Sequence, residues 1–231
     1  MTAAPPDVTT IIARLEALAS PADAAGMARF GIRGARVLGV PVKTLRAIAR
    51  EIGRSHALAE GLWASGIHEA RILASIVAEP QRVDPAQMER WVADLDSWDL
   101  CDQCCTNLWV RTPFAHNTAL EWSEREAEFV KRAGFVLMAQ VAGKDTNAPT
   151  ELFHRYLARA EAAADDERNF VKKAISWALR EIGQRSPELN AAAIAVARRL
   201  READSRAARW VGTDALRELT SEKAVRRIAR R

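Results

Sequence analysis

Apolar residues recur every three or four positions along most of this chain, which is the spacing of one face of an α-helix. The first such stripe begins at Val8 and stops before Pro21. Alternating patterns typical of strands are absent, and the chain is rich in Ala, Leu, Arg and Glu, which favour helices. The sequence therefore predicts an all-α protein. Further stripes fall within residues 41–52, 68–77, 97–111, 129–141, 170–182 and from Ser186 onward.

Polar residues just before several stripes predict where helices begin. Asp84-Pro85 and Ser186-Pro187 each combine an N-cap residue with a first-turn proline. Ser123, with Glu126 three residues later, predicts a capping box at the start of the next helix.

The helical segments are mostly about 10 to 18 residues long, and helix pairs recur roughly every 40 residues. This spacing predicts a curved α-solenoid of HEAT-like antiparallel helix pairs, forming a single domain over residues 1–231 with a concave surface for a long ligand. Because the repeat is weak in residue identity, a non-repetitive helical bundle is the alternative.

Positive charge is concentrated in the C-terminal third. From Arg168 to the end there are 16 Lys or Arg and 7 Asp or Glu, a net charge of +9. The whole chain of 231 residues carries only +4, so the part before Arg168 carries −5. This asymmetry favours a surface that meets a polyanion, although solvated helix faces would give the same composition.

Several protein classes are excluded or disfavoured by the sequence. No apolar run approaches the roughly 20 residues needed to cross a bilayer, so we expect no membrane association. Residues 1–6 have neither the basic region nor the apolar stretch of a signal peptide. The three clustered cysteines, an odd number, favour a reducing compartment. We therefore expect a cytoplasmic protein.

The segment 97–105 places a carboxylate near indoles. Trp98, Asp102 and Trp109 fall on one border of its apolar stripe, and such a group is suited to stabilising a cation or positioning a water molecule. The alternative is that Asp102 caps a neighbouring helix while Trp98 is core. The stripe itself is expected to face the core and consists of Leu100, Cys101, Cys104, Cys105 and Leu108.

A metal site is not predicted. Zinc sites usually combine two pairs of ligands, and the single cysteine-rich turn has no second pair. His68-Glu69 lacks the second histidine of a metalloprotease helix, so we expect a structural role for it. The histidines are scattered at His56, His68, His116 and His154.

The segment 170–180 predicts a helix with an indole on a basic face. Trp177 lies between Lys173 and Arg180, away from the centre of the apolar face. Aromatic rings among basic residues are typical of surfaces that grip phosphates and contact sugars or bases. Packing of the indole between cationic side chains at a repeat interface is the alternative. The buried face is predicted to contain Val171, Ala174, Ile175, Ala178 and Ile182.

Arg132 is the third candidate. Its same-face neighbours on the helix are Phe129 and Val136, and the rest of the helix is largely apolar. A guanidinium group in such a place needs an anion, either an internal Asp or a phosphate.

Together, the segments 97–102, 130–132 and 173–181 resemble the AlkD-type DNA alkylation repair family, which is built from HEAT-like repeats. Residues 27–30, 38–40 and 68–71 look like its N-terminal helices. The resemblance therefore covers nearly the whole chain.

The resemblance implies a monofunctional DNA glycosylase for cationic alkylpurines such as 3-methyladenine and 7-methylguanine, acting without flipping the base into a pocket. It implies that Asp102 is the catalytic carboxylate, that Trp98 and Trp177 contact the deoxyribose, and that Arg132 contacts a phosphate. Phe30 stands where the family can place a stacking Tyr, and Phe170 matches an aromatic of the basic helix.

The basic neighbours Lys173 and Arg180 complete the expected DNA contacts. The expected partner is double-stranded DNA with alkylated bases, bound by a monomer associated with the nucleoid, with no cofactor. Pro41, where a polar residue is expected, and the missing hydroxyl of Phe30 leave the lesion preference open. A non-catalytic HEAT-like module that binds nucleic acid or protein is the alternative.

Overall fold

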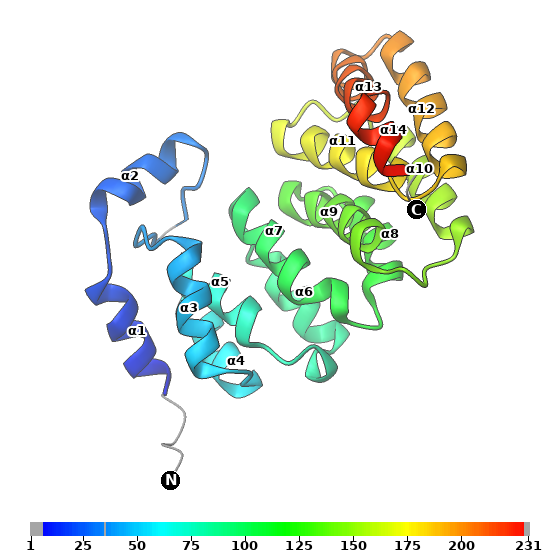
Figure 1. Ribbon diagram of the computed structural model, residues 1–231. Coiled ribbons are helices and arrows are strands. Elements are labelled where there is room, and N and C mark those ends of the chain that lie inside the picture. The colour runs from blue at the N-terminus through cyan, green and yellow to red at the C-terminus, as the bar shows by residue number, and fades with distance from the viewer. Residues whose placement is uncertain (1–6, 35, 229–231) are drawn as a thin grey trace. The chain divides into compact units, whose positions relative to one another are not determined.

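The computed structural model describes residues 7–34 and 36–228, and all regular structure in these ranges is helical (Figure 1). The prediction of an all-α protein is confirmed. Within the same ranges, no helix is both long and apolar enough to cross a lipid bilayer. The segment 1–6, for which no signal peptide is predicted, lies outside the described residues.

Contacts between helices divide the chain into two compact units, Met1–Thr112 and Pro113–Arg231, here called unit 1 and unit 2. The single domain expected from the sequence stays a prediction. Unit 1 contains α1 (Val8–Ala17), α2 (Pro21–Arg29), α3 (Val42–Ile52), α4 (His56–Ala64), α5 (His68–Val77), the 3₁₀ turn η1 (Pro80–Arg82), α6 (Pro85–Ala93), α7 (Trp98–Asn107) and the 3₁₀ turn η2 (Trp109–Arg111).

Three helices of unit 1 form a layer in which α3 packs against α5 and α5 packs against α7 (Figure 1). The helices α4 and α1 add to this layer, because α4 packs on α5 and α1 contacts both. The sequence pattern did not single out α4, whose apolar residues are nearly continuous: of its nine residues, Leu58, Ala59, Leu62 and Trp63 are all buried.

The buried carboxylate of Glu69 fixes the loop between α2 and α3. Backbone amides of residues 38–40 donate to it at 2.9, 2.7 and 3.3 Å. Gly39 in this loop has a φ of 80°, and a Cβ there would lie 2.3 Å from the carbonyl oxygen of Ser20, so the turn needs glycine. The structural role expected for His68-Glu69 therefore fits the contacts of Glu69.

Unit 2 is centred on α9, which packs against α8 and α11 (Figure 1). The close approach of α8 and α9 requires Gly134, because a Cβ there would lie 2.3 Å from the backbone nitrogen of Ser123. Beyond α11, the helices α12 and α13 pack together and onto it. The helices are α8 (Ala115–Ser123), α9 (Glu128–Lys144), α10 (Thr150–Ala162), α11 (Asn169–Gly183), α12 (Pro187–Glu202), α13 (Arg206–Leu219) and α14 (Glu222–Ile228).

Two of the three predicted helix starts are confirmed. Asp84 accepts a hydrogen bond from the Gln87 amide at 2.6 Å, and Ser186 caps α12 in the same way. The capping box at Ser123 is wrong. Ser123 ends α8 and donates its hydroxyl to the carbonyl of residue 120, so it is not available to cap α9, which begins at Glu128 without a side-chain cap.

Candidate nucleic-acid interface

The two site residues predicted on α7 lie where this helix borders solvent. Trp98 is the first residue of α7, Asp102 follows one turn later, and both are partly exposed. The stripe of leucines and cysteines is completely buried, as predicted. The position predicted for Trp109 is wrong: α7 ends at Asn107, and the following turn places the Trp109 indole fully in the core.

Trp98 is held in place by the end of α2. Its indole Nε1 donates a hydrogen bond to the carbonyl oxygen of Phe30 at 2.9 Å. Phe30 is the C-cap residue of α2, and it is 73% exposed. Within unit 1, the structure therefore brings together Phe30, Trp98 and the helix that carries Asp102, with an aromatic ring free to stack on a ligand.

The N-terminal turns of α5 and α7 are joined by a buried pair beside these residues. His68 Nε2 lies 2.9 Å from Asp99 Oδ2. Burial alone lowers the pKa of His68, but the hydrogen bond and charge of Asp99, with the charges of Glu69 and Asp96, raise it above its usual value. The pair fixes the rotation of α7 and so the directions of Trp98 and Asp102.

The three cysteines of α7 are core residues. All are fully buried, and burial raises the pKa values of the Cys104 and Cys105 thiols, which keeps both protonated at neutral pH. Among the described residues, no group of three or more His, Cys, Asp or Glu is placed to hold a metal ion.

In unit 2, three predicted site residues of α11 line one pocket of about 530 Å³. The predicted apolar face of α11 is completely buried, which turns Trp177 toward this pocket at the border of the helix. The Trp177 indole donates to Glu181 Oε1 at 3.3 Å, so its ring is oriented. The pocket is lined by Lys173, Trp177, Arg180, Glu181, Trp210 and Asp214.

The two basic residues of this pocket differ in their surroundings. Arg180 forms an ion pair with Glu218, and its Nε lies 3.9 Å from Asp214 Oδ2. Its positive charge is therefore largely balanced. Lys173 is exposed and has no ion pair within the described part of the chain. Of the two, Lys173 is better placed to meet a phosphate.

Trp210 lines the same pocket and was missed by the sequence analysis. It lies on α13 and is 37% exposed. The ammonium group of Lys172 lies over its ring, 5.5 Å from the ring centre. The sequence signal was present, because Trp210 follows Arg209 within the basic C-terminal third. The pocket therefore has two indoles among cationic side chains.

Arg132 lies in the core of unit 2, separate from the residues that line this pocket. It is 5% exposed, and its guanidinium donates to the main-chain carbonyl of Phe170 on α11. The Phe170 ring packs on Phe129, with ring centres 5.9 Å apart. Arg132 thus links α9 to the start of α11. The sequence analysis had considered an internal Asp or a phosphate as its partner and did not include this carbonyl.

The profile of the DNA alkylation repair enzyme family matches residues 11–219. The chain belongs to this family. A solved structure from a new family of proteins related to the HEAT-like repeat DNA glycosylases, with affinity for branched DNA structures, superposes with a TM-score of 0.76. The two share 22% sequence identity over 84% of this chain and 83% of the other, a likeness that confirms the HEAT-like fold. No curated protein matches the chain significantly.

In this member of the family, each unit carries one aromatic and polar cluster. Unit 1 presents Trp98 beside a carboxylate, and unit 2 presents Trp177 and Trp210 beside Lys173. Carboxylates and indole faces stabilise positive charge, and indoles among cations suit a sugar-phosphate chain.

Proposed function

We propose that this chain is a monofunctional DNA glycosylase that hydrolyses the N-glycosidic bond of cationic alkylpurines, such as 3-methyladenine and 7-methylguanine, in duplex DNA. The observation that carries the proposal is the pairing of Trp98 and Asp102, one helical turn apart at the partly exposed border of α7. Membership of the DNA alkylation repair enzyme family supports it.

The leaving group of this reaction needs little catalytic help. An alkylated purine already carries a positive charge, so its departure needs no general acid. Positive charge grows instead on the deoxyribose, where the Asp102 carboxylate and the indole of Trp98 stabilise it. The same carboxylate orients the attacking water molecule. The reaction requires no cofactor.

The decisive experiment is the release of bases from DNA treated with a methylating agent. The expected result is time-dependent release of 3-methyladenine and 7-methylguanine by the wild-type protein, measured by chromatography of the free bases. An Asp102→Asn preparation of equal purity controls for contaminating glycosylases. No release above this control by well-folded wild-type protein would exclude the proposed activity.

A non-catalytic DNA-binding protein is the second candidate, because the superposed relative belongs to a family described by its affinity for branched DNA. Such a protein would bind a four-way junction more tightly than a duplex and release no base. A glycosylase would release bases from duplex DNA whatever its affinity for junctions. Base release and the junction-to-duplex affinity ratio together separate the two functions.

Either function places the protein with the chromosome. We propose that it acts as a monomer associated with the nucleoid in the cytoplasm. Sedimentation of the free protein and of its DNA complex tests the monomer, because a dimer on a short duplex would have twice the expected protein mass.

A further inference from the structure

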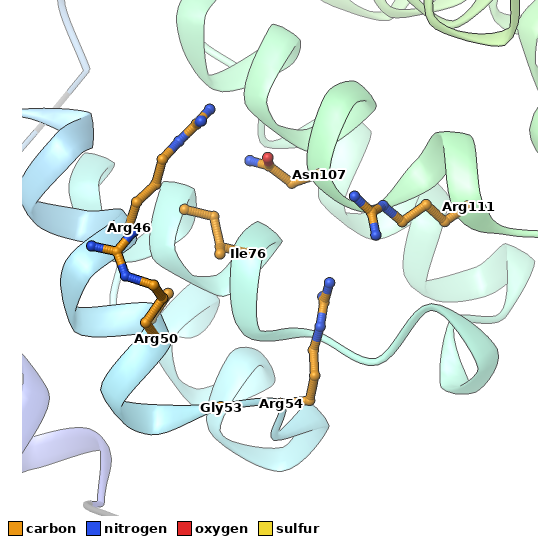
Figure 2. A pocket seen from close by; sticks show the side chains of 8 residues that line it. Arg46, Arg50, Gly53, Arg54, Ile76, Asn107 and Arg111 are labelled. Carbon is orange, nitrogen blue, oxygen red and sulfur yellow. The ribbon is translucent and has the colours of Figure 1, made fainter. Parts of the chain in front are cut away.

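Unit 1 contains a second basic pocket, of about 360 Å³, which the sequence analysis did not predict. Figure 2 shows the guanidinium groups of Arg54 and Arg111 pointing into it, with Asn107 on its far wall. Arg46 extends from α3 toward the same space. The pocket is lined by Arg46, Ala49, Arg50, Gly53, Arg54, Ile76, Asn107 and Arg111.

The charged residues that line this pocket are all positive. No Asp or Glu is among its lining residues. Within the described part of the chain, none of its four arginines has a carboxylate within 4 Å, whereas nearby Arg14 and Arg90 both pair with a Glu. Guanidinium groups that line one pocket without a carboxylate in contact attract an anion.

Arg54 and Arg111 are close enough to repel one another. Burial, followed by the charge of Arg111, lowers the pKa of Arg54 from its usual value. A phosphate between them would relieve this repulsion, and guanidinium groups match its oxygens in pairs.

Helix capping explains only one of the four arginines. Arg54 donates to the carbonyl of Ala78 at the C-terminus of α5, where a cation is favourable. Arg46, Arg50 and Arg111 are exposed, and their side chains form no hydrogen bond or ion pair with the described residues. Their side chains are therefore free to meet a ligand.

Hydrogen bonds hold the Asn107 side chain in the wall of the pocket, away from Asp102. The Asn107 amide nitrogen donates to Ser75 Oγ at 3.2 Å and to Gln103 Oε1 at 3.0 Å. Asn107 comes five residues after Asp102, so the two side chains leave α7 about 140° apart. Trp98 is nine residues from Asn107, which is about 13 Å along the helix axis. Successive nucleotides of a DNA strand are roughly 3.4 Å apart, so this distance spans more than one nucleotide.

We propose that this arginine pocket binds a backbone phosphate of DNA, at a nucleotide other than the one whose base is removed. The inference rests on the DNA binding in the proposed function and is independent of base excision. The arginine pocket adds affinity and fixes the position of the DNA, whereas it leaves the chemical step unchanged.

The test compares two double variants that remove the same charge from unit 1. Arg46→Ala with Arg111→Ala empties the pocket of two exposed arginines. The control, Arg82→Ala with Arg90→Ala, removes two exposed arginines outside it, each 3.6 Å from a partly exposed Glu, a kind of ion pair that contributes little to stability. Duplex affinity is measured between low and moderate salt, together with the melting temperature and the single-turnover rate of base release at saturating protein.

The pocket variant is expected to bind duplex DNA roughly 10- to 100-fold more weakly at low salt. Its slope of log affinity against log salt should be shallower by about 0.9 for each phosphate that the variant no longer neutralises. The control should bind like wild type, and all proteins should melt alike and, once saturated, release bases at one rate. Absence of base release by the wild type would overturn the glycosylase but leave the comparison of affinities intact.

Two results would overturn the proposal. Equal affinity losses in both double variants would show that only net charge matters. Wild-type duplex binding by the pocket variant, with loss of binding to adenosine monophosphate or inorganic phosphate, would assign the pocket to a free anion instead of the DNA backbone.

Discussion

The indole nitrogen of Trp98 donates its hydrogen bond to the main-chain carbonyl of Phe30, not to the Phe30 side chain. The orientation of the indole on α7 is therefore set by the backbone at the end of α2. Phe30 is 73% exposed, and its ring does not take part in this contact. The two aromatic residues can consequently be tested separately.

Phe30→Ala is expected to weaken duplex binding by roughly 5- to 100-fold, because stacking on one base is worth about 1–3 kcal/mol. The melting temperature should not change, since the exposed ring packs little and the carbonyl that holds Trp98 remains. Leu18→Ala is the matched control, because Leu18 is another exposed apolar residue of unit 1, at 45%. Fluorescence titration with a labelled duplex measures both, and equal affinities of the two variants would remove the DNA contact from Phe30.

Asp102→Asn is expected to slow base release by about 100- to 1,000-fold, the usual effect of removing one electrostatic stabiliser of a transition state. DNA affinity should survive, because the amide preserves shape and removes a negative charge from a surface proposed to face DNA. Asp96→Asn is the matched control, since Asp96 is exposed just before α7. Single-turnover base release, duplex affinity and melting temperature are measured on the same preparations.

The opposite pattern would assign Asp102 a structural role. If its carboxylate supports the fold, Asp102→Asn should lower the melting temperature and reduce binding and excision together. Base release at the wild-type rate by a well-folded Asp102→Asn protein would rule out the proposed mechanism.

Helical periodicity was sufficient to predict the fold class and the buried faces of α7 and α11, because burial of one face decides which positions are apolar. It failed at Trp109, since the period was extended past the end of α7 into a 3₁₀ turn that directs side chains differently. The capping box at Ser123 failed for a related reason. A serine can equally end one helix or begin the next, and tertiary packing of α8 on α9 decides which.

The candidate site was predictable only where one helix carries it. Trp177 and Lys173 share α11, so their spacing revealed the pair. The sequence did not predict the role of Trp210 or the arginine pocket, because their neighbours come from other helices whose packing the sequence pattern does not specify. The same limit explains Arg132, whose guanidinium donates to a backbone carbonyl of another helix.

Arg132→Ala is expected to lower the melting temperature, because it leaves the Phe170 carbonyl without this donor at a cost of about 1–3 kcal/mol. At temperatures where the variant is folded, affinity for damaged and undamaged duplexes should change by the same factor, because the buried guanidinium supports the fold and does not contact the base. Arg132→Lys keeps the charge and serves as the comparison. Weaker binding of the lesion-bearing duplex alone would contradict this role.

Trp210→Ala is expected to reduce duplex affinity roughly tenfold, because its indole is a partly exposed platform beside Lys172 and Lys173. Trp210→Phe keeps an aromatic face and should retain most of the affinity. Both variants should fold normally, since 37% of the residue is already exposed. If Phe and Ala at this position bind alike, stacking on Trp210 is not part of DNA binding.

The pair of His68 and Asp99 predicts how stability depends on pH. Because Asp99 raises the pKa of His68 in the folded protein, despite the opposing effect of burial, the folded state holds the proton more tightly than the unfolded state does. The stabilisation is therefore fully present below the usual histidine pKa of about 6.5 and is lost as the pH rises through the raised value.

His68→Gln should remove this stabilisation, so the difference in unfolding free energy between wild type and variant should shrink as the pH rises above about 6.5. Denaturant unfolding at pH 5.5 to 8.5 measures this difference, and NMR titration of the His68 ring measures the pKa directly. His154→Gln is the control, because its partner Glu188 is exposed and the pair lies on the surface. A difference that grows with pH would show that burial, not Asp99, determines the protonation of His68.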